Sequence, residues 1–190
     1  MASSRIHENR EDIKSIKAAD LIPEVIDIKL YHGSNHTIKQ PDPNFSKRSK
    51  MDFGKAFYTT TSEEQARRFT HLVLSRNKGN GTKTINIYDF DISAFSDLKI
   101  KDFQDKIDEW FDYVEKNRRH SKQSYCDYDI VIGPVADDNI QETFLLYEAE
   151  VIDKQEAIKR LKLEVLEDQL AFKSPMSVTY LRFLESVEVT

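Results

Sequence analysis

Two short stretches of the chain bring together residue types that can bind a flat heteroaromatic ring. His32 is followed directly by Gly33 at the end of an apolar segment, and Gly54 precedes a second apolar segment that contains Tyr58. An imidazole can donate a hydrogen bond from one ring nitrogen to a ribose hydroxyl while the backbone fixes the other nitrogen. A glycine leaves its backbone open to a planar amide, and a tyrosine ring can stack on an aromatic cation. These are the contacts that a nicotinamide ring and its ribose would require.

A third stretch could supply charge to the same chemistry. Glu167 and Gln169 stand two residues apart in a predicted strand, and would therefore face the same side of a sheet. A carboxylate there could stabilise the cation that develops on a ribose as nicotinamide leaves, whereas an amide could only hydrogen-bond ribose hydroxyls. Losing such a preorganised contact often costs about 10²–10³ in rate. The alternative is that these residues form the charged beginning of a strand and face water.

Each feature also has a plain structural explanation. A His-Gly pair can simply make a turn, Tyr58 and Phe69 can be core residues, and the acidic pair Asp137 and Asp138 fits a turn or a helix cap as well as an acceptor or ribose contact. The phosphate-binding patterns Gly-x-x-x-x-Gly-Lys and Gly-x-Gly-x-x-Gly are both missing from the sequence. No cluster of His and Cys has metal-ligand spacing, so we predict no metal.

The strands that would position these residues follow from hydrophobic spacing. Four apolar segments are expected to be strands, at residues 28–31, 56–60, 84–90 and 128–132. The third alternates polar and apolar residues, which predicts a half-buried strand, and the fourth is apolar enough to be buried. Further strands are expected at residues 163–172 and at the C-terminal end. The polar loop that joins the first two is long enough to be a lid or to be disordered.

Helices are expected between these strands. Thr61 or Ser62 caps a helix that runs to about Arg76. Apolar residues at helical spacing predict an amphipathic helix from residue 103 to residue 119, and residues 154–161 fit another helix. Residues 144–151 fit a helix or a strand. Because the elements alternate without repeated βαβ units, the sequence favours an α+β fold with mainly antiparallel strands.

Composition narrows the class of protein. The chain has 190 residues, which suits one domain at residues 21–190 behind a polar segment, 1–20, expected to be a frayed helix or disordered. A formal net charge of −5 argues against binding nucleic acid through bulk charge, although local basic clusters occur at 47–50 and 117–120. The lone Cys126 and the missing apolar spans favour a cytoplasmic protein without membrane contact; a specialised secretion route would leave no readable mark.

Taken together, the motifs resemble the poly-ADP-ribose-polymerase-like branch of the ADP-ribosyltransferase superfamily. That branch has His-Gly on one strand, Gly-Lys-Gly-x-Tyr on the next, an aromatic residue eleven positions further, and a Glu on a later strand. Here the first motif is His32-Gly33, the second runs from Gly54 to Tyr58 with Ala56 in place of a glycine, and Phe69 follows at the right spacing.

A bacterial family of unknown function within this superfamily is the closer resemblance. It is similar over residues 128–138, which begin Tyr-Asp-Ile-Val-Ile-Gly-Pro, and at Gln169 and Phe172, so that the likeness spans residues 28–185. The resemblance implies a split α+β fold of two packed, mainly antiparallel sheets flanked by helices. It also implies an enzyme that cleaves NAD, its substrate, at the bond between nicotinamide and ribose.

The resemblance assigns roles to individual residues. His32 would contact the adenosine ribose, Gly33 the carboxamide, and Tyr58 and Phe69 would hold the ring between them. The flanking Ser34, Gly54 and Thr59 complete the expected NAD-binding set. His32, Tyr58, Glu167 and Gln169 form the expected catalytic set.

One departure from the superfamily pattern matters for activity. Gln169 stands where the superfamily has Glu, so that Glu167 or another residue would supply the charge, or the enzyme would be weak. Three functions follow: an NAD-dependent ADP-ribosyltransferase, an NAD glycohydrolase, or a non-catalytic module that binds NAD or ADP-ribose. The first, our leading prediction, would modify a macromolecular acceptor as a bacterial toxin or effector, which would imply a cognate inhibitor protein.

Overall fold

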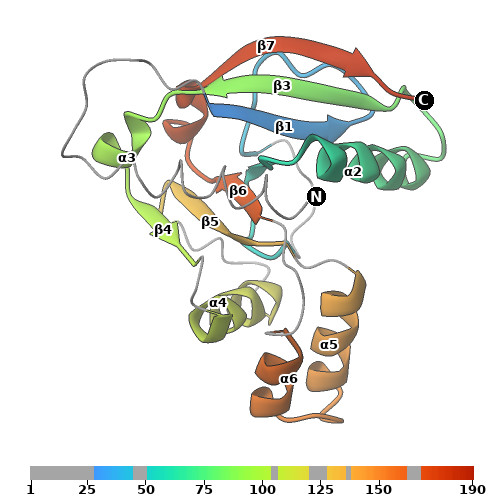
Figure 1. The fold of residues 1–190 in the computed structure, drawn as a ribbon, viewed down its shortest axis with the longest axis vertical. Coiled ribbons are helices and arrows are strands. Elements are labelled where there is room, and N and C mark those ends of the chain that lie inside the picture. Colours follow the sequence, from blue (N-terminus) through green and yellow to red (C-terminus); the bar gives the residue numbers. More distant parts are fainter. Residues whose placement is uncertain (1–27, 45–50, 104–106, 120–127, 136–137, 162–167) are drawn as a thin grey trace, which may run out of the picture.

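The computed structural model describes residues 28–44, 51–103, 107–119, 128–135, 138–161 and 168–190, which build two sheets with helices around them (Figure 1). One sheet has the order β1-β3-β7 and the other β2-β6-β5-β4. Every pairing is antiparallel except β4 with β5. The strands are β1 (Ile28–Ser34), β2 (Phe57–Thr59), β3 (Thr84–Phe90), β4 (Ile100–Asp102), β5 (Ile130–Pro134), β6 (Asp168–Phe172) and β7 (Leu181–Glu188). The predicted α+β class with mainly antiparallel strands is confirmed.

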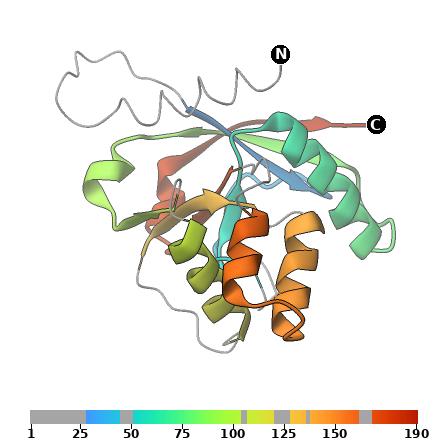
Figure 2. The ribbon, with the colours of Figure 1, turned by 60° about the horizontal axis from the view of Figure 1, so that its bottom comes forward.

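The helices cover the sheets on different sides. Helix α2 (Glu63–Arg76) packs on β1 and β3, whereas α4 (Ile107–Arg119), α5 (Asp138–Glu148) and α6 (Lys154–Leu161) form a separate layer against the four-stranded sheet (Figures 1 and 2). The short α3 (Ala94–Asp97) and the 3-10 helix η1 (Ser177–Tyr180) serve as connections. Helix α2 from the first group and α5 from the second border a common cleft.

Alternation along the strands divides the core into two. Ile130 and Ile132 of β5 point into a core between the sheets, whereas Val131 points into a second core against the helical layer. Strand β6 alternates in the same way, with Leu170 and Phe172 between the sheets and Ala171 toward the helices. Because side chains on a strand alternate between its faces, Gln169 lies on the same face of β6 as Ala171.

Local sequence explains where α2 begins and ends. The Ser62 hydroxyl accepts a hydrogen bond from the backbone N–H of Gln65, and Glu63 and Glu64 occupy the first turn. After Arg76 the chain turns through Lys78 and Gly79, both at positive φ. The predicted helix is confirmed at both ends. The strand before it is present but shorter than predicted, at Phe57–Thr59 instead of residues 56–60.

Several expectations are corrected. Strand β1 runs on through His32 and Gly33 to Ser34, because it pairs with β3 over its whole length, so the His-Gly pair lies inside the strand rather than at its end. Strand β3 is buried on both faces rather than half-buried, since it is the central strand of its sheet. Part of the presumed lid also covers it: Asn86 accepts a hydrogen bond from Ile38 N–H.

Other differences concern short or ambiguous segments. Strand β4 and helix α3 were not expected, because three and four residues carry too little periodicity. The ambiguous residues 144–151 are helical as far as Glu148, and Asp138 begins α5 instead of closing a turn. Among the residues that the structure describes, no helix has the length and apolarity needed to cross a membrane.

Some expectations concern segments outside the described residues. These are the polar segment 1–20, the basic cluster 47–50, Cys126, Asp137 and Glu167.

Candidate functional site

A cleft of about 480 Å³ brings several of the predicted residues together. It is lined by His32 and Gly33 from β1, Tyr58 from β2, Phe69 from α2 and Gln169 from β6. These residues come from four elements spread over more than a hundred positions of the chain. The volume lies in the range of clefts that hold small molecules.

His32 is fixed by strand β2. Its Nδ1 lies 2.6 Å from the backbone carbonyl oxygen of Tyr58, and its ring stacks on Phe57 with the centroids 4.4 Å apart. Burial lowers the pKa of the His32 imidazole to about 4, and the hydrogen bond to Tyr58 opposes this lowering only in part. Because a carbonyl oxygen can only accept, Nδ1 carries the proton and Nε2 is left as an acceptor. We expected this histidine to donate to a ribose hydroxyl; the neutral ring instead offers Nε2 to accept from one.

Gly33 permits close contact between β1 and α2. A Cβ built at this position would lie 2.3 Å from the carbonyl oxygen of Ala66, a backbone atom that cannot rotate away. The backbone of Gly33 has a second feature. Tyr31 exchanges both of its backbone hydrogen bonds with Thr60, and residues two apart on a strand direct their N–H and C=O to the same edge. Gly33 therefore directs its backbone polar groups to the edge of β1 away from β3, where a planar amide could pair with them.

Tyr58 holds the loop that precedes β2. Its hydroxyl donates to the carbonyl of Gly54 at 2.6 Å and accepts from the N–H of Phe53 at 3.1 Å. Burial, followed by the Asp52 carboxylate, raises the pKa of the Tyr58 hydroxyl well above its usual value, so the group stays protonated. Anchored in this way, the ring lines the cleft with little freedom to move.

Phe69 offers a second aromatic surface to the cleft, from helix α2 instead of from a strand. It projects from the middle of α2, remains 37% exposed, and carries the guanidinium of Arg76 at 5.9 Å from its ring centroid. Arg76 also lines the cleft. The helix thus brings an aromatic ring and a cation to the same cavity.

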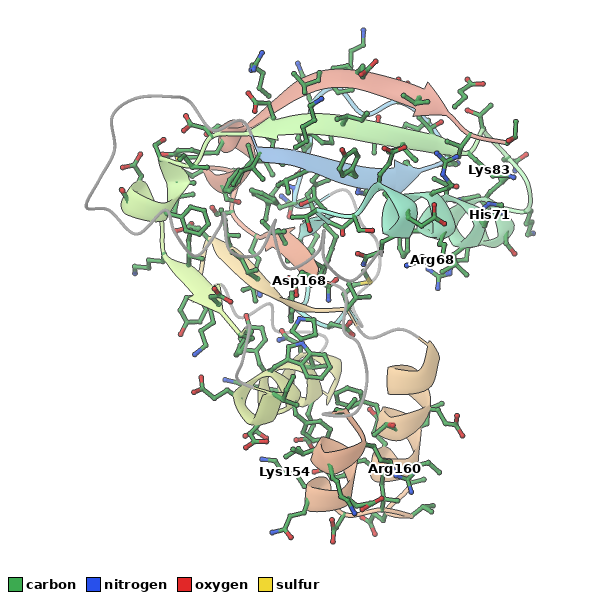
Figure 3. The ribbon with its side chains drawn as sticks, in the orientation of Figure 1. Arg68, His71, Lys83, Lys154, Arg160 and Asp168 are labelled. Atoms are coloured by element: carbon green, nitrogen blue, oxygen red, sulfur yellow. The ribbon has the colours of Figure 1, made fainter. Side chains whose placement is uncertain are left out.

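Gln169 is buried in the cleft wall rather than exposed at a strand start. Its Nε2 donates to the carbonyl oxygen of Pro134 at 3.1 Å and to Asp52 Oδ2 at 3.4 Å, and the residue is only 8% exposed. Asp168, labelled near the centre of Figure 3, directly precedes it. The two N–H groups of the amide therefore have two acceptors, one of them a carboxylate.

The remaining predicted residues divide into two groups. Thr59 lines the cleft, while Ser34 and Gly54 lie outside its lining, and Gly54 contributes instead through a turn at φ +77° and its carbonyl bond to Tyr58. Glu167 lies outside the described residues. Within the part of the chain that the structure covers, no three His, Cys, Asp or Glu side chains converge as metal ligands.

Several residues of the cleft belong to none of the sequence motifs. Asp52 stands two positions before Gly54, and its proximity to Gln169 could not be anticipated because 117 positions separate them. Arg76 and Glu148 at the ends of two helices also line the cleft. The one sequence signal for Arg76 is a positive charge about two helical turns after Phe69 on the same predicted helix.

A family model described as "Protein of unknown function (DUF3990)" matches residues 28–183. The chain belongs to this family. The expected membership of a family of unknown function is thereby confirmed, and the described residues of the DUF3990 match contain every element that borders the cleft. The description names no activity or wider superfamily, so the likeness to ADP-ribosyltransferases stays a prediction. No curated protein and no solved structure matches the chain.

Proposed function

We propose that the cleft binds NAD through its nicotinamide end and that the protein is an ADP-ribosyltransferase. The observation that carries this proposal is the meeting of His32, Gly33, Tyr58 and Phe69 in one cavity. The sequence motifs required these four residues to meet, and they stand on three different elements.

Each contact has a chemical counterpart in the substrate. The backbone of Gly33 pairs with the carboxamide, Nε2 of His32 accepts from a ribose hydroxyl, and the rings of Tyr58 and Phe69 face the pyridinium. A desolvated cation on an aromatic face gains roughly 1–2 kcal/mol. Arg76 supplies the positive charge that a pyrophosphate favours, because its planar guanidinium can bind two oxygens at once.

The reaction begins with heterolysis of the bond between C1′ of the ribose and the nicotinamide nitrogen. The electron pair of that bond goes to the ring nitrogen, which becomes neutral, and C1′ is left in an oxocarbenium-like state. A nucleophile on a macromolecular acceptor then donates a lone pair to C1′ and loses its proton. Positioning of this kind can supply up to roughly 7–11 kcal/mol of the barrier.

The proposal also includes the fold of the protein, its role in the cell and a partner. The protein acts as a bacterial toxin or effector, its fold is the split ADP-ribosyltransferase fold, and a cognate inhibitor protein restrains it. The mainly antiparallel two-sheet architecture supports the fold assignment.

A second candidate function is a non-catalytic module that binds NAD or ADP-ribose. Gln169 favours it, because an amide cannot supply the negative charge that the superfamily pattern places at this position. Under this alternative NAD would raise the melting temperature of the protein and remain intact over hours.

Two substitutions on α2 test the binding proposal. Phe69 and Leu72 are both exposed apolar residues of the helix, at 37% and 46%, but only Phe69 lines the cleft. Phe69→Ala should weaken NAD binding about tenfold, the equivalent of about 1.4 kcal/mol, and Leu72→Ala should leave it unchanged. Calorimetric titration with NAD measures both. Equal affinities in the two variants would show that the ring does not contact the ligand.

A transfer assay separates the enzymatic candidates. The protein is incubated with NAD labelled in the adenylate phosphate and with whole-cell lysate. Label on macromolecules indicates a transferase, free ADP-ribose with released nicotinamide indicates a glycohydrolase, and intact NAD indicates a binding module.

A further inference from the structure

The cleft holds a carboxylate that none of the sequence motifs assigns. Asp52 lines the cavity beside Tyr58 and Gln169, and its Oδ2 accepts a hydrogen bond from Gln169 Nε2 at 3.4 Å. The same carboxylate acts on the Tyr58 hydroxyl, whose pKa it helps to raise. A negative charge therefore stands in the wall of the cleft even though position 169 carries an amide.

Gln169 suits this arrangement in a way that a glutamate would not. Its amide nitrogen faces two acceptors, the Asp52 carboxylate and the Pro134 carbonyl. An ionised glutamate has no proton to give either of them, and a buried carboxylate beside another is strongly disfavoured. The amide is therefore matched to a carboxylate supplied from elsewhere in the chain.

The backbone next to Asp52 is anchored on both sides. Gly54 N–H donates to the carbonyl of Met51 at 2.9 Å, which closes a turn around Asp52. The Tyr58 hydroxyl bonds to Phe53 and Gly54, and the buried Lys173 donates from Nζ to the Phe53 carbonyl at 2.6 Å. Such anchoring is what a preorganised electrostatic contact requires, because a mobile loop would reorganise during the reaction.

We propose that the Asp52 carboxylate is the catalytic carboxylate of this cleft and that Gln169 is a positioning residue that orients it. The proposal rests on the proposed NAD-cleaving function. As the C1′–nitrogen bond breaks and its electron pair leaves with nicotinamide, Asp52 faces the positive charge that remains on the ribose. The nucleophile, an acceptor hydroxyl or amine or a water molecule, then attacks C1′ and gives its proton to the carboxylate or to solvent.

The test compares Asp52→Asn with Glu142→Gln. Each replaces a carboxylate by its neutral amide of equal size, but Glu142 is an exposed residue of α5 that does not line the cleft. Two quantities are measured for each full-length variant: the rate of nicotinamide release from NAD and the dissociation constant of NAD by calorimetry. Melting temperatures check the fold.

We expect Asp52→Asn to release nicotinamide about 10²–10³ times more slowly than the wild type, the usual cost of one preorganised contact, with its NAD dissociation constant within about threefold. Glu142→Gln should stay within about threefold in rate. A charge exchange, Asp52→Asn together with Gln169→Glu, should recover at least tenfold of the lost rate, because the carboxylate then returns to the same wall of the cleft with an amide beside it.

Four results would overturn the assignment. If Asp52→Asn keeps its rate while Glu167→Gln loses it, the charge lies at Glu167 and the proposed NAD chemistry stands without Asp52. If Asp52→Asn loses NAD binding as strongly as turnover, Asp52 is a binding residue only. If the wild type binds NAD but releases no nicotinamide, no carboxylate in the cleft is catalytic, and if it does not bind NAD, the proposed function itself is wrong.

Discussion

Nδ1 of His32 lies 2.6 Å from the backbone carbonyl oxygen of Tyr58, which ties the imidazole of β1 to strand β2. The two strands belong to different sheets. This hydrogen bond joins the two sheets at the cleft, next to the backbone pair of Tyr31 and Thr60. It also fixes the tautomer of the ring, so that the acceptor nitrogen Nε2 points away from that carbonyl. Because burial holds the pKa of this imidazole at about 4, the ring is neutral at physiological pH.

This neutral histidine predicts how stability depends on pH. In the unfolded chain a histidine takes up a proton near pH 6.5, whereas His32 in the folded protein does so only near pH 4. Between these values the unfolded state binds more protons, so the free energy of unfolding falls as the pH is lowered, by at most about 3 kcal/mol. We expect His32→Gln to remove this dependence. Denaturant unfolding at half-unit steps from pH 7 to pH 4 measures it.

The matched control is His71→Gln. His71 is exposed on the outer side of α2 (Figure 3), and its replacement should leave the pH slope of the wild type unchanged. Equal slopes for wild type and His32→Gln would contradict the prediction.

A second prediction concerns the contact between β1 and α2. In Gly33→Ala the new methyl group would lie 2.3 Å from the Ala66 carbonyl oxygen, so α2 must move away from the strand. Overpacking of this kind costs about 1–3 kcal/mol. Because Ala66 and Phe69 line the cleft from the same helix, NAD binding should weaken as well. Denaturant unfolding and titration with NAD test the two effects.

Gly79→Ala separates the effect of space from that of backbone conformation. Gly79 has φ +79° and nothing within 4 Å of an added Cβ. Its replacement should cost about 1–2 kcal/mol through the left-handed conformation alone and leave NAD binding intact. Weakened binding in both variants would mean that lost stability, and not the position of α2, is responsible.

The sequence predicts those parts of the cleft that are formed by residues close together in the chain. Strand β2, the Ser62 cap and the spacing from Tyr58 to Phe69 lie within about a dozen positions, and turn chemistry and periodicity are enough to place them. The same reasoning cannot give the burial of β3, because Asn86 is satisfied only when the segment around Ile38 folds over it.

Long-range pairs lie beyond sequence reasoning for the same reason. The hydrogen bond from Gln169 to Asp52 joins residues 117 positions apart, and β4 forms only by pairing with β5. Neither segment has a pattern of its own that reveals the partner. The role of Gln169 was therefore predicted from a superfamily motif, and only the fold brings a carboxylate to its side.

A third prediction concerns the buried lysine beneath the loop that carries Asp52. Lys173 is 4% exposed, and its Nζ donates to the Phe53 carbonyl at 2.6 Å and to the Tyr113 hydroxyl at 3.1 Å. Lys173→Met leaves that buried carbonyl without this donor, which costs about 1–3 kcal/mol. The loop should also lose its fixed position, so nicotinamide release should fall more than NAD affinity.

Lys55→Met is the control for the lysine, since Lys55 is an exposed lysine of the same loop. It should keep both the melting temperature and the rate of the wild type. A Lys173→Met protein that melts at the wild-type temperature would show that Phe53 is held by other contacts.

The last prediction tests whether Gln169 is needed as an amide. In Gln169→Glu a carboxylate would face the Pro134 carbonyl and the Asp52 carboxylate in a buried wall, which should cost about 3 kcal/mol or more at pH 7. The same surroundings raise the pKa of the new carboxyl in the folded state above its value in the unfolded chain. The folded state then binds more protons between the two values, so the deficit relative to the wild type should shrink as the pH is lowered.

Gln65→Glu is the matched control. It makes the same substitution in the same cleft, at a position where the side chain accepts a hydrogen bond. The Gln65 side chain accepts through Oε1 from the Thr60 hydroxyl at 2.5 Å, and a carboxylate can accept that bond equally well. This variant should therefore stay close to the stability of the wild type at pH 7. If both substitutions destabilise the protein to the same extent, the cleft merely repels added negative charge, and the two-donor role of Gln169 is wrong.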